Sequence, residues 1–236
     1  MKNVLFLDFD GTITQCDVTD LILEAFAEPQ WRAIEADWEA GRMGSRDCLH
    51  AQMRLVRASR RELDDLLDSI EIDDGFGGLL EVCACNSIQV HIVSEGFDYC
   101  IRRILARSAE LTPLLRGVRI CASHLEPEGD RWRIEFPFAH HSCPHGCATC
   151  KPMVMRLLAR ASARAIFVGD GLSDRYAAQH ADEVFAKGRL ADFCATRGIA
   201  FFPYARLAEV AAHLAARGDA LNGRADEEIL VGMEAS

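Results

Sequence analysis

Short apolar runs recur along the chain, and polar side chains directly follow three of them. The three runs are Val4 to Leu7 before Asp8, Ile88 to Val93 before Ser94, and Ala165 to Val168 before Gly169 and Asp170. Runs that are apolar throughout at this length are typical of parallel strands buried on both faces. Weaker runs at Val184 to Ala186 and Ile199 to Phe202 predict two further strands.

Stretches with helical composition lie between these strands. We expect helices at about Phe97 to Arg107, Lys151 to Ala161, Arg189 to Arg197 and Tyr204 to Arg217. Alternation of strands and helices predicts an α/β fold, a Rossmann-like three-layer parallel sheet with helices on both faces. Ligands bind at the carboxyl ends of the strands in such sheets. Asp8, Ser94 and Asp170 are therefore expected to converge on one site.

Two segments interrupt the alternation. Residues 17–74 are rich in Ala, Leu, Glu and Arg without a convincing strand, which predicts an inserted cap of three or four helices. Residues 1–16 and 75–218 would then form the α/β core, with 219–236 as a tail. The second interruption, Val118 to Phe136, predicts a small β-hairpin whose four-residue turn is Pro127-Glu128-Gly129-Asp130.

The charge and composition narrow the class of partner. A net charge of -10 over 236 residues argues against nucleic acid or an anionic membrane surface as the partner. No apolar run reaches the roughly 18 residues that a transmembrane helix requires. The first residues meet an acidic pair too early for a signal peptide, so the 10 cysteines are expected to be reduced thiols. These features predict a cytoplasmic protein that acts on a small molecule, and they leave its oligomeric state open.

The first strand leads directly into Asp8-Phe9-Asp10-Gly11-Thr12. Two carboxylates at i and i+2, on a turn relaxed by Gly11, can both face a site beyond the sheet. One can act as nucleophile while the other exchanges protons. Together they offer the hard oxygen ligands that Mg²⁺ prefers. A solvated helix cap is the alternative, and the buried strand before Asp8 favours the site.

Four short motifs occur in order along the chain: Asp8 to Thr12, Ser94, Lys151, and Gly169 to Asp174. In this order they resemble the four motifs of the haloacid dehalogenase (HAD) superfamily, and the resemblance covers nearly the whole chain. It implies a phosphatase that hydrolyses a small phosphorylated metabolite through an aspartyl-phosphate on Asp8. Asp10 would then be the general acid and base.

The resemblance also implies the ligands of phosphate and metal. Ser94, the backbone N–H of Glu95 and the ammonium of Lys151 would bind the phosphoryl oxygens. Mg²⁺ would be held by Asp8, Asp170 and the backbone carbonyl of Asp10, with Asp174 supporting the set.

The helical insertion and the run from Ser94 to Asp98 resemble the phosphoserine-phosphatase-like branch, closest to the MtnX-like group. That group is related to a methionine-salvage phosphatase acting on a methylthio-substituted keto phosphate, so a substrate of this type is one expectation. Further similarities are Asp17 and Asp20, Trp31 and Trp38, the run Gly41 to Arg46, and the cysteines before Lys151.

One position separates this chain from phosphoserine phosphatases. Gln52 falls where they have the arginine that reads the substrate carboxylate, although Asp17 keeps the acidic position that would meet an ammonium. This difference predicts that phosphoserine is a poor substrate, unless Arg46 or Arg54 supplies the missing cation.

Cys143, Cys147 and Cys150 lie just before Lys151, near His140, His141 and His145. The Cys-x3-Cys-x2-Cys spacing is plausible for a structural Zn²⁺. No second cysteine pair lies at zinc-finger distance, so we favour thiols that pack a loop and position Lys151.

Two rival functions remain. A phosphoserine phosphatase or a phosphotransferase of the same superfamily would use the same intermediate. A non-catalytic binding protein with the HAD fold belongs to another class, and the intact side chains of all four motifs disfavour it.

Overall fold

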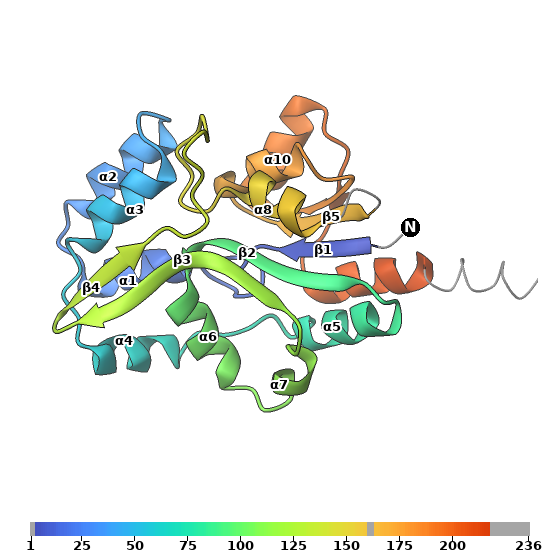
Figure 1. Ribbon diagram of the computed structural model, residues 1–236, viewed down its shortest axis with the longest axis horizontal. Coiled ribbons are helices and arrows are strands. Elements are labelled where there is room, and N and C mark those ends of the chain that lie inside the picture. The colour runs from blue at the N-terminus through green and yellow to red at the C-terminus, as the bar shows by residue number, and fades with distance from the viewer. Residues whose placement is uncertain (1–2, 160–162, 218–236) are drawn as a thin grey trace, which may run out of the picture.

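A seven-stranded sheet forms the centre of the molecule, as the computed structural model shows for residues 3–159 and 163–217 (Figure 1). The strand order is β4-β3-β2-β1-β5-β6-β7, and every neighbouring pair is parallel except β3 and β4. The strands are β1 (Asn3–Leu7), β2 (Gln89–Phe97), β3 (Arg119–Glu128), β4 (Arg131–Glu135), β5 (Arg164–Gly169), β6 (Glu183–Ala186) and β7 (Phe202–Pro203).

The central strand β1 is buried on both faces, with Leu5, Phe6 and Leu7 inaccessible to solvent. It pairs with β2 on one side and with β5 on the other. The chain therefore builds outward from β1 through β2 and β3, and then returns to place β5 on the opposite side. Ligands bind at such a reversal of strand order in open α/β sheets.

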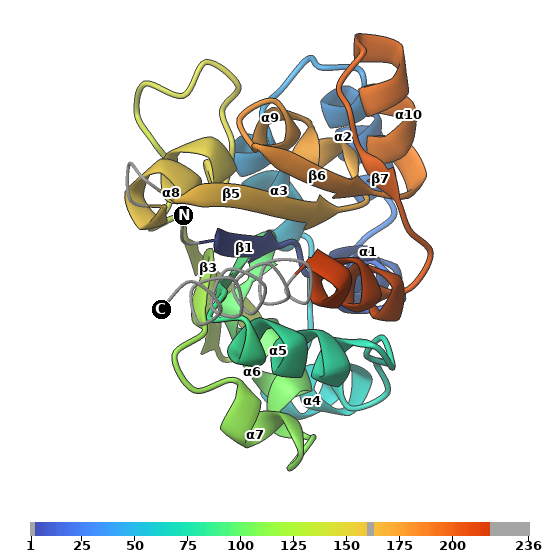
Figure 2. The ribbon, with the colours of Figure 1, turned by 90° about the vertical axis from the view of Figure 1, so that its right-hand side faces the viewer.

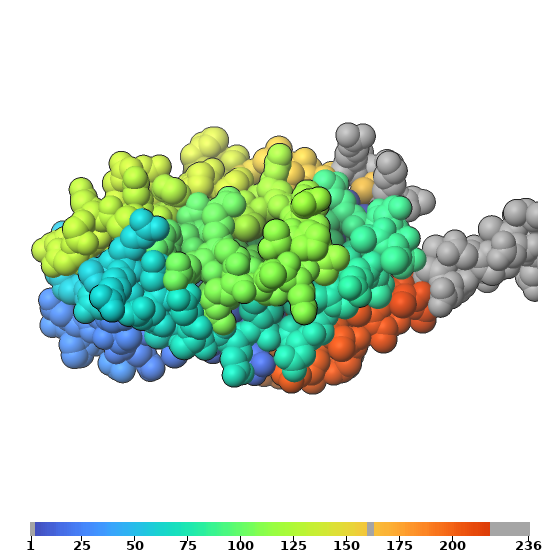
Figure 3. All heavy atoms as spheres, turned by 90° about the horizontal axis from the view of Figure 1, so that it is seen from below, coloured from blue at the N-terminus to red at the C-terminus, as the bar shows by residue number. Residues whose placement is uncertain are grey.

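Helices cover both faces of the sheet (Figures 1 and 2). One face carries α5 (Phe76–Cys85), α6 (Asp98–Ala106), α7 (Leu111–Leu114) and a helix that begins at Leu207 and continues to Arg217. Figure 3 shows this side of the molecule covered by these helices and by α4 (Arg60–Leu67). The other face carries α8 (Lys151–Leu158), α9 (Arg175–Ala178) and α10 (Gly188–Arg197). The predicted three-layer α/β fold is confirmed.

The segment between β1 and α5 folds into four helices and contains no strand. They are α1 (Val18–Phe26), α2 (Trp31–Glu39), α3 (Ser45–Met53) and α4 (Arg60–Leu67). α2 packs against α3, and α4 packs against α6, where Tyr99 donates to Asp64 at 2.5 Å. The β3–β4 hairpin is held to the same segment, because the indole of Trp132 donates to the carbonyl of Ala58 at 2.9 Å.

Several helix and strand boundaries differ from those predicted. The hairpin is confirmed, but its four-residue turn is wrong, because Pro127 and Glu128 still pair with Trp132 and Arg131 and leave a two-residue connection. The last helix begins at Leu207 instead of Tyr204, and β7 is confined to two residues. The helix expected to reach Ala161 ends at Leu158. Residues 160–162 and the predicted tail at 219–236 lie outside the described residues.

No helix among the described residues combines the length and the apolar character that crossing a bilayer requires.

Candidate active site

Asp8 follows β1 at the carboxyl edge of the sheet. Its backbone N–H donates to the carbonyl of Val168 at 2.9 Å, which continues the β1–β5 pairing one residue past the strand. The chain then turns at Gly11, whose φ of +68° is a conformation that glycine adopts most readily. A Cβ at Gly11 would lie 2.3 Å from a carboxylate oxygen of Asp170. A side chain at this position would therefore displace Asp170.

Lys151 begins α8 and lies between two carboxylates. Its Nζ is 2.8 Å from Oδ1 of Asp8 and 2.5 Å from Oδ1 of Asp174, and the lysine side chain is 1% exposed. Burial disfavours the charge on Lys151, yet the attraction of Asp174 and Asp8 outweighs this cost and raises its pKa. The ammonium is therefore held charged at the end of β1.

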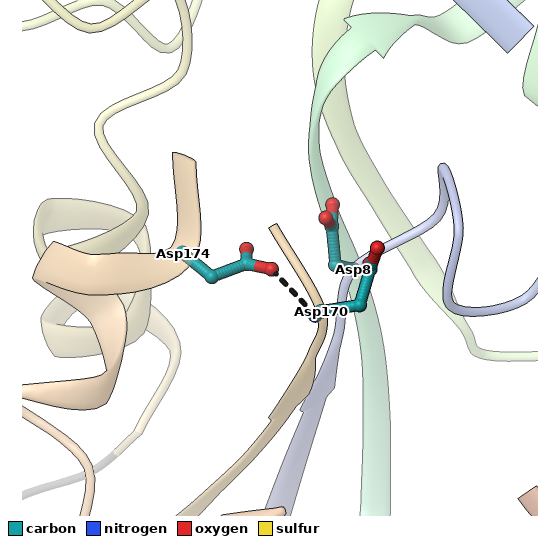
Figure 4. Close-up of side chains that lie close together, drawn as sticks. All are labelled: Asp8, Asp170 and Asp174. Carbon is teal, nitrogen blue, oxygen red and sulfur yellow. Dashed lines mark hydrogen bonds between the residues drawn. The ribbon is translucent and has the colours of Figure 1, made fainter. Parts of the chain in front are cut away.

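Asp174 fixes the loop that follows β5 (Figure 4). Its Oδ2 accepts the backbone N–H groups of Asp170 and Gly171 at 3.0 and 3.1 Å, while Oδ1 accepts Lys151. A Cβ at Gly169 would lie 2.3 Å from Oδ2 of Asp174, so this close approach requires glycine. Both oxygens of Asp174 are therefore engaged, Oδ2 with the loop and Oδ1 with Lys151.

Asp170 is held by the loop that carries Asp8. Its Oδ1 accepts the hydroxyl of Thr12 at 2.8 Å. Oxygens of Asp8, Asp170 and Asp174 all lie within 4.8 Å of one another. Burial, followed by repulsion from Asp174, raises the pKa of Asp8 and also raises the pKa of Asp170 to about 6. This concentration of negative charge in a buried site favours a bound cation.

Asp10 faces the cavity from the same loop. Its two oxygens accept the backbone N–H of Val18 at 3.1 Å and the hydroxyl of Ser94 at 3.2 Å. Burial, with added repulsion from Asp17, raises the pKa of Asp10 to about 8. Its carboxyl group is therefore largely protonated near neutral pH, as a general acid requires.

Ser94 lies where the pairing of β2 with β3 is irregular, between Val93 and Phe97. Such bulges re-aim side chains at the edges of sheets. The hydroxyl of Ser94 accepts the backbone N–H of Gly96 at 2.9 Å. A Cβ at Gly96 would lie 2.5 Å from Oδ2 of Asp10, so glycine allows the two loops to meet. Glu95 stands between Ser94 and Gly96 and lines the same cavity.

A cavity of about 480 Å³ opens above these groups. Its floor contains Asp8, Asp10, Ser94, Glu95 and Asp170. Its opposite wall comes from the first three helices of the 17–74 segment and from α10, and consists of Asp17, Thr19, Asp20, Trp31, Glu35, Trp38, Glu39, Ser45, Cys48, Leu49, Gln52 and Arg189. The volume lies within the range of about 300–1,000 Å³ that is usual for small-molecule sites.

Of the four residues suggested for substrate recognition, two line the cavity and two do not. Asp17 and Gln52 line the cavity. Gln52 is 1% exposed, and its amide donates to Glu35 at 2.8 Å. Arg46 pairs with its neighbour Asp47 at 3.3 Å, and Arg54 is exposed at the end of α3. Neither arginine lines the cavity.

The cysteine loop lies against the start of α3. Backbone N–H groups of Arg46 and Ala148 donate across this contact, to the carbonyl of Gly146 at 3.0 Å and to the hydroxyl of Ser45 at 3.1 Å. Cys147 and Cys150 are buried, and Cys143 is half-buried. Burial alone would raise the pKa of the Cys143 thiol. The net effect is a lowered pKa, because Cys143 accepts hydrogen bonds from the backbone N–H groups of Cys147 and His145 and from the thiols of Cys147 and Cys150. Among the described residues, the one set of metal-ligating side chains gathered tightly enough for an ion is the aspartate cluster.

The sequence reasoning missed the acidic cavity wall formed by α2. Trp31, Glu35, Trp38 and Glu39 all line the cavity. They are spaced i, i+4, i+7 and i+8, which places them on one face of a helix. This spacing is visible in the sequence, but of the four residues only the tryptophans entered the prediction, as a similarity to the MtnX-like group. Thr12 and Tyr204, whose hydroxyls lie 3.4 Å apart beneath Asp170, were also missed.

Comparison with known proteins agrees with this geometry. The family model described as haloacid dehalogenase-like hydrolase matches residues 5–179. The 2-hydroxy-3-keto-5-methylthiopentenyl-1-phosphate phosphatase of Geobacillus thermodenitrificans (strain NG80-2) is 30% identical over 214 residues, which cover 89% of this chain and 94% of the relative. The protein of the same name from Geobacillus kaustophilus (strain HTA426) is 31% identical, over 88% of this chain and 93% of the relative.

Solved structures share the fold. A phosphoserine phosphatase from T. onnurineus in complex with NDSB-201 superposes with a TM-score of 0.66 at 16% identity, over 91% of this chain and 95% of the other. A phospho-aspartyl intermediate analogue of phosphoserine phosphatase gives a TM-score of 0.65 at 16% identity, over 87% and 94% of the two chains.

Proposed function

Because the chain belongs to the haloacid dehalogenase-like hydrolase family, we propose that it hydrolyses a small phosphomonoester with Mg²⁺, through an aspartyl-phosphate on Asp8. One observation carries the proposal. Asp8 lies at the floor of the cavity with the Lys151 ammonium 2.8 Å from one of its oxygens, next to the carboxylate of Asp170. Phosphoryl transfer depends on positioning and charge neutralisation, and this arrangement supplies both.

The residues present fit a magnesium ion. Asp8, Asp170 and the backbone carbonyl of Asp10 would hold it, and Asp174 would keep Asp170 in place through the loop amides. Carboxylate and carbonyl oxygens are the ligands that Mg²⁺ prefers, and the raised pKa of Asp8 and of Asp170 reflects negative charge that a cation would offset. When bound, the ion neutralises charge on the phosphoryl oxygens.

Asp8 and Asp10, on the loop after β1, have different chemical roles. An oxygen of Asp8 forms a bond to phosphorus as the bond from phosphorus to the alcohol oxygen breaks, and the protonated Asp10 gives its proton to that oxygen. The ionised Asp10 then takes a proton from water, which attacks phosphorus and releases phosphate and the Asp8 carboxylate. Ser94, the N–H of Glu95 and Lys151 would hold the phosphoryl oxygens during both steps.

We assign the cap function to residues 17–74, with 1–16 and 75–218 as the core. The support is that α1, α2 and α3 supply most of the wall facing Asp8. A wall contributed by a separate segment can close over a substrate and exclude water.

For the substrate we favour a small phosphate ester without a carboxylate, because Gln52 and Glu35 form the wall where an anion would have to bind. The keto phosphate named for the Geobacillus relatives meets this condition. A phosphotransferase would use the same intermediate with an alcohol as acceptor. The cytoplasm is the compartment we propose, since all 10 cysteines are free thiols.

Turnover of p-nitrophenyl phosphate tests this function. Phosphate release should require Mg²⁺ and stop on addition of a chelator. Asp8→Asn should remove turnover in a protein that is still folded by circular dichroism, because an amide cannot form the acyl phosphate. Asp65→Asn, which changes an exposed acid on α4, is the matched control. Activity retained in purified Asp8→Asn would exclude the phosphoaspartyl mechanism.

A further inference from the structure

The cavity is large compared with a phosphoryl group, so most of it must receive the alcohol part of the substrate. Asp8, Ser94 and Lys151 mark the phosphoryl end. The remaining wall, built by α1, α2, α3 and α10, is what the alcohol part contacts. The composition of this distal wall therefore bears on the substrate class, provided that the proposed phosphatase function holds.

Three acids dominate the distal wall: Asp17, Asp20 and Glu35. Both aspartates keep contact with solvent, yet partial desolvation raises the pKa of each to about 6, with added repulsion from Asp20 at Asp17 and from Glu35 at Asp20. Partial burial also raises the pKa of Glu35, and repulsion from Asp17 raises it further. The two aspartates still carry most of their charge near neutral pH, because that pH lies above 6.

The partners of these acids are neutral. Glu35 accepts hydrogen bonds from the amide of Gln52 at 2.8 Å and from the thiol of Cys48 at 3.8 Å. Asp17 accepts the backbone N–H of Asp20 at the start of α1. Among the described residues that line the cavity, the one cationic side chain is Arg189, and it is paired with Glu39 at 2.5 Å. The distal wall therefore keeps an unbalanced negative charge.

Apolar groups complete this wall. Trp38 is half-buried and Leu49 is buried, and both line the cavity beside the acids. An indole face attracts a cation, most strongly where water is excluded. Acids and an aromatic ring on one wall suit an ammonium group, whereas a carboxylate there would be repelled by all three acids.

We propose that the alcohol part of the substrate carries a cationic ammonium group and no carboxylate, so that the substrate is an amino-alcohol phosphate. The phosphoryl group lies against Asp8 and Lys151, and the ammonium lies against Asp20, Glu35 and Trp38. This assignment extends the proposed function. The substrate in the names of the Geobacillus relatives is different, because the alcohol part of that keto phosphate carries no charge.

Matched pairs of esters test the assignment. Aminoalkyl phosphates, beginning with O-phosphoethanolamine, are compared with alkyl phosphates of equal length, beginning with n-propyl phosphate. The ammonium replaces a methyl group of similar size, so the ratio of the two kcat/KM values isolates the charge. At one chain length or more the ratio should exceed about tenfold, the effect of one favourable charge contact in a partly enclosed site.

Two variants locate the interaction. Glu35→Gln and Asp20→Asn should each lower this ratio by about threefold or more, because each removes one of the attracting charges. Asp37→Asn is the control on α2, since Asp37 is only partly buried, pairs with Arg42 and does not line the cavity. It should leave the ratio unchanged.

The outcomes distinguish the two proposals. If p-nitrophenyl phosphate and the alkyl phosphates are hydrolysed and the ratio stays near one at every length, the phosphatase function stands and the ammonium assignment is wrong. Failure to hydrolyse the aminoalkyl series while p-nitrophenyl phosphate turns over has the same meaning. If no ester is hydrolysed with Mg²⁺, the proposed function fails and the assignment fails with it.

Discussion

Nζ of Lys151 lies 2.8 Å from Oδ1 of Asp8, and their side chains are only 1% and 6% exposed. The two residues come from different parts of the chain and meet because β1 ends where α8 begins. A charge pair enclosed to this degree is costly to break, because removal of one partner leaves the other buried and uncompensated. The same pair that would activate the site is therefore tied to the stability of the fold.

Lys151→Met should lower the free energy of unfolding by about 3–5 kcal/mol near neutral pH. The loss should shrink as the pH falls toward the ordinary carboxyl value of 3.8, because burial raises the pKa of Asp8 in the folded state. A protonated Asp8 needs no partner, so stability is lost as the pH rises from that ordinary value through the raised one. Urea unfolding of the variant at several pH values measures this.

Lys187→Met is the control for that experiment. Lys187 is half-buried and packs over the ring of Tyr204 at 5.1 Å, with no ion pair to Asp8. Its removal should cost less and should show a weaker pH dependence. Equal losses for the two variants at every pH would contradict the role of Lys151 as the counter-charge of Asp8.

Asp10→Asn should slow both chemical steps by about 10²–10⁴-fold, the usual contribution of a positioned general acid or base. The raised pKa of about 8 keeps Asp10 protonated for the first step, and no proton can be transferred from an amide. Breakdown of the phosphoenzyme should suffer most, because water must be activated. Single-turnover rapid-quench experiments resolve the steps, and unchanged rates for both would show that Asp10 has no acid or base role.

O-phosphoserine should be a poor substrate compared with the aminoalkyl phosphates, because the acids of the distal wall repel its carboxylate. Gln52→Arg should raise the kcat/KM of phosphoserine relative to O-phosphoethanolamine, since the new guanidinium would pair with Glu35 and meet the carboxylate. Gln52→Met keeps the size without the charge and should not. Thermal unfolding of both variants checks that the buried position tolerates the change. If phosphoserine were the best substrate of the wild-type protein, the assignment of the distal wall would be wrong.

The sheet could be predicted because its strands are buried on both faces and therefore apolar without interruption. Asp8 and Asp170 stand out in such a sequence as the first polar side chains after their strands. The four helices between β1 and α5 could be predicted from composition alone. The boundaries of β7 and of the hairpin connection could not, because exposed edge strands carry no continuous apolar pattern.

The wall of the cavity was harder to predict. Glu35 reads as an ordinary exposed acid on an amphipathic helix until Gln52, from the next helix, is placed beside it. Arg46 and Arg54 are near Gln52 in sequence and were natural candidates for a substrate-reading cation. The helical rotation of α3 directs Gln52 to the cavity and leaves both arginines outside it. Such contacts between helices depend on packing that short motifs do not encode.

Preference for the aminoalkyl esters should depend on pH. The pKa of Asp17 and of Asp20 is about 6, raised by enclosure and by neighbouring acids, with Glu35, Glu24 and Glu39 facing Asp20. These groups are charged above that value and neutral below it, so the attraction for ammonium is lost as the pH falls. The ratio of kcat/KM for O-phosphoethanolamine to that for n-propyl phosphate should fall about threefold or more between about pH 7.5 and about pH 5. Titration of Asp10 affects both esters alike, so the ratio removes it, and each rate is corrected for the dianion fraction of its own phosphate, because the ammonium lowers the phosphate pKa. A ratio that rises on acidification would contradict the proposed charges.

The cysteine loop joins the start of α3 to Lys151, because Gly146 accepts the backbone N–H of Arg46 and the loop runs directly into α8. If Cys143, Cys147 and Cys150 act by packing, the loop should position Lys151 without a metal ion. Protein purified without added metal should then contain no stoichiometric zinc by elemental analysis.

Cys147→Ser should therefore cost about 1–2 kcal/mol of stability, the range usual for a single buried substitution, and should lower kcat modestly through the placement of Lys151. Cys194→Ser, at a buried thiol on α10 outside the loop, is the matched control. It should cost similar stability and leave kcat less affected, because α10 does not carry Lys151. A zinc ligand would behave differently, since its loss would release the ion and disorder the loop. Near one zinc per chain in the wild-type protein, lost in Cys147→Ser and retained in Cys194→Ser, would show that the thiols are ligands, with His140, His141 or His145 as the candidates for the fourth.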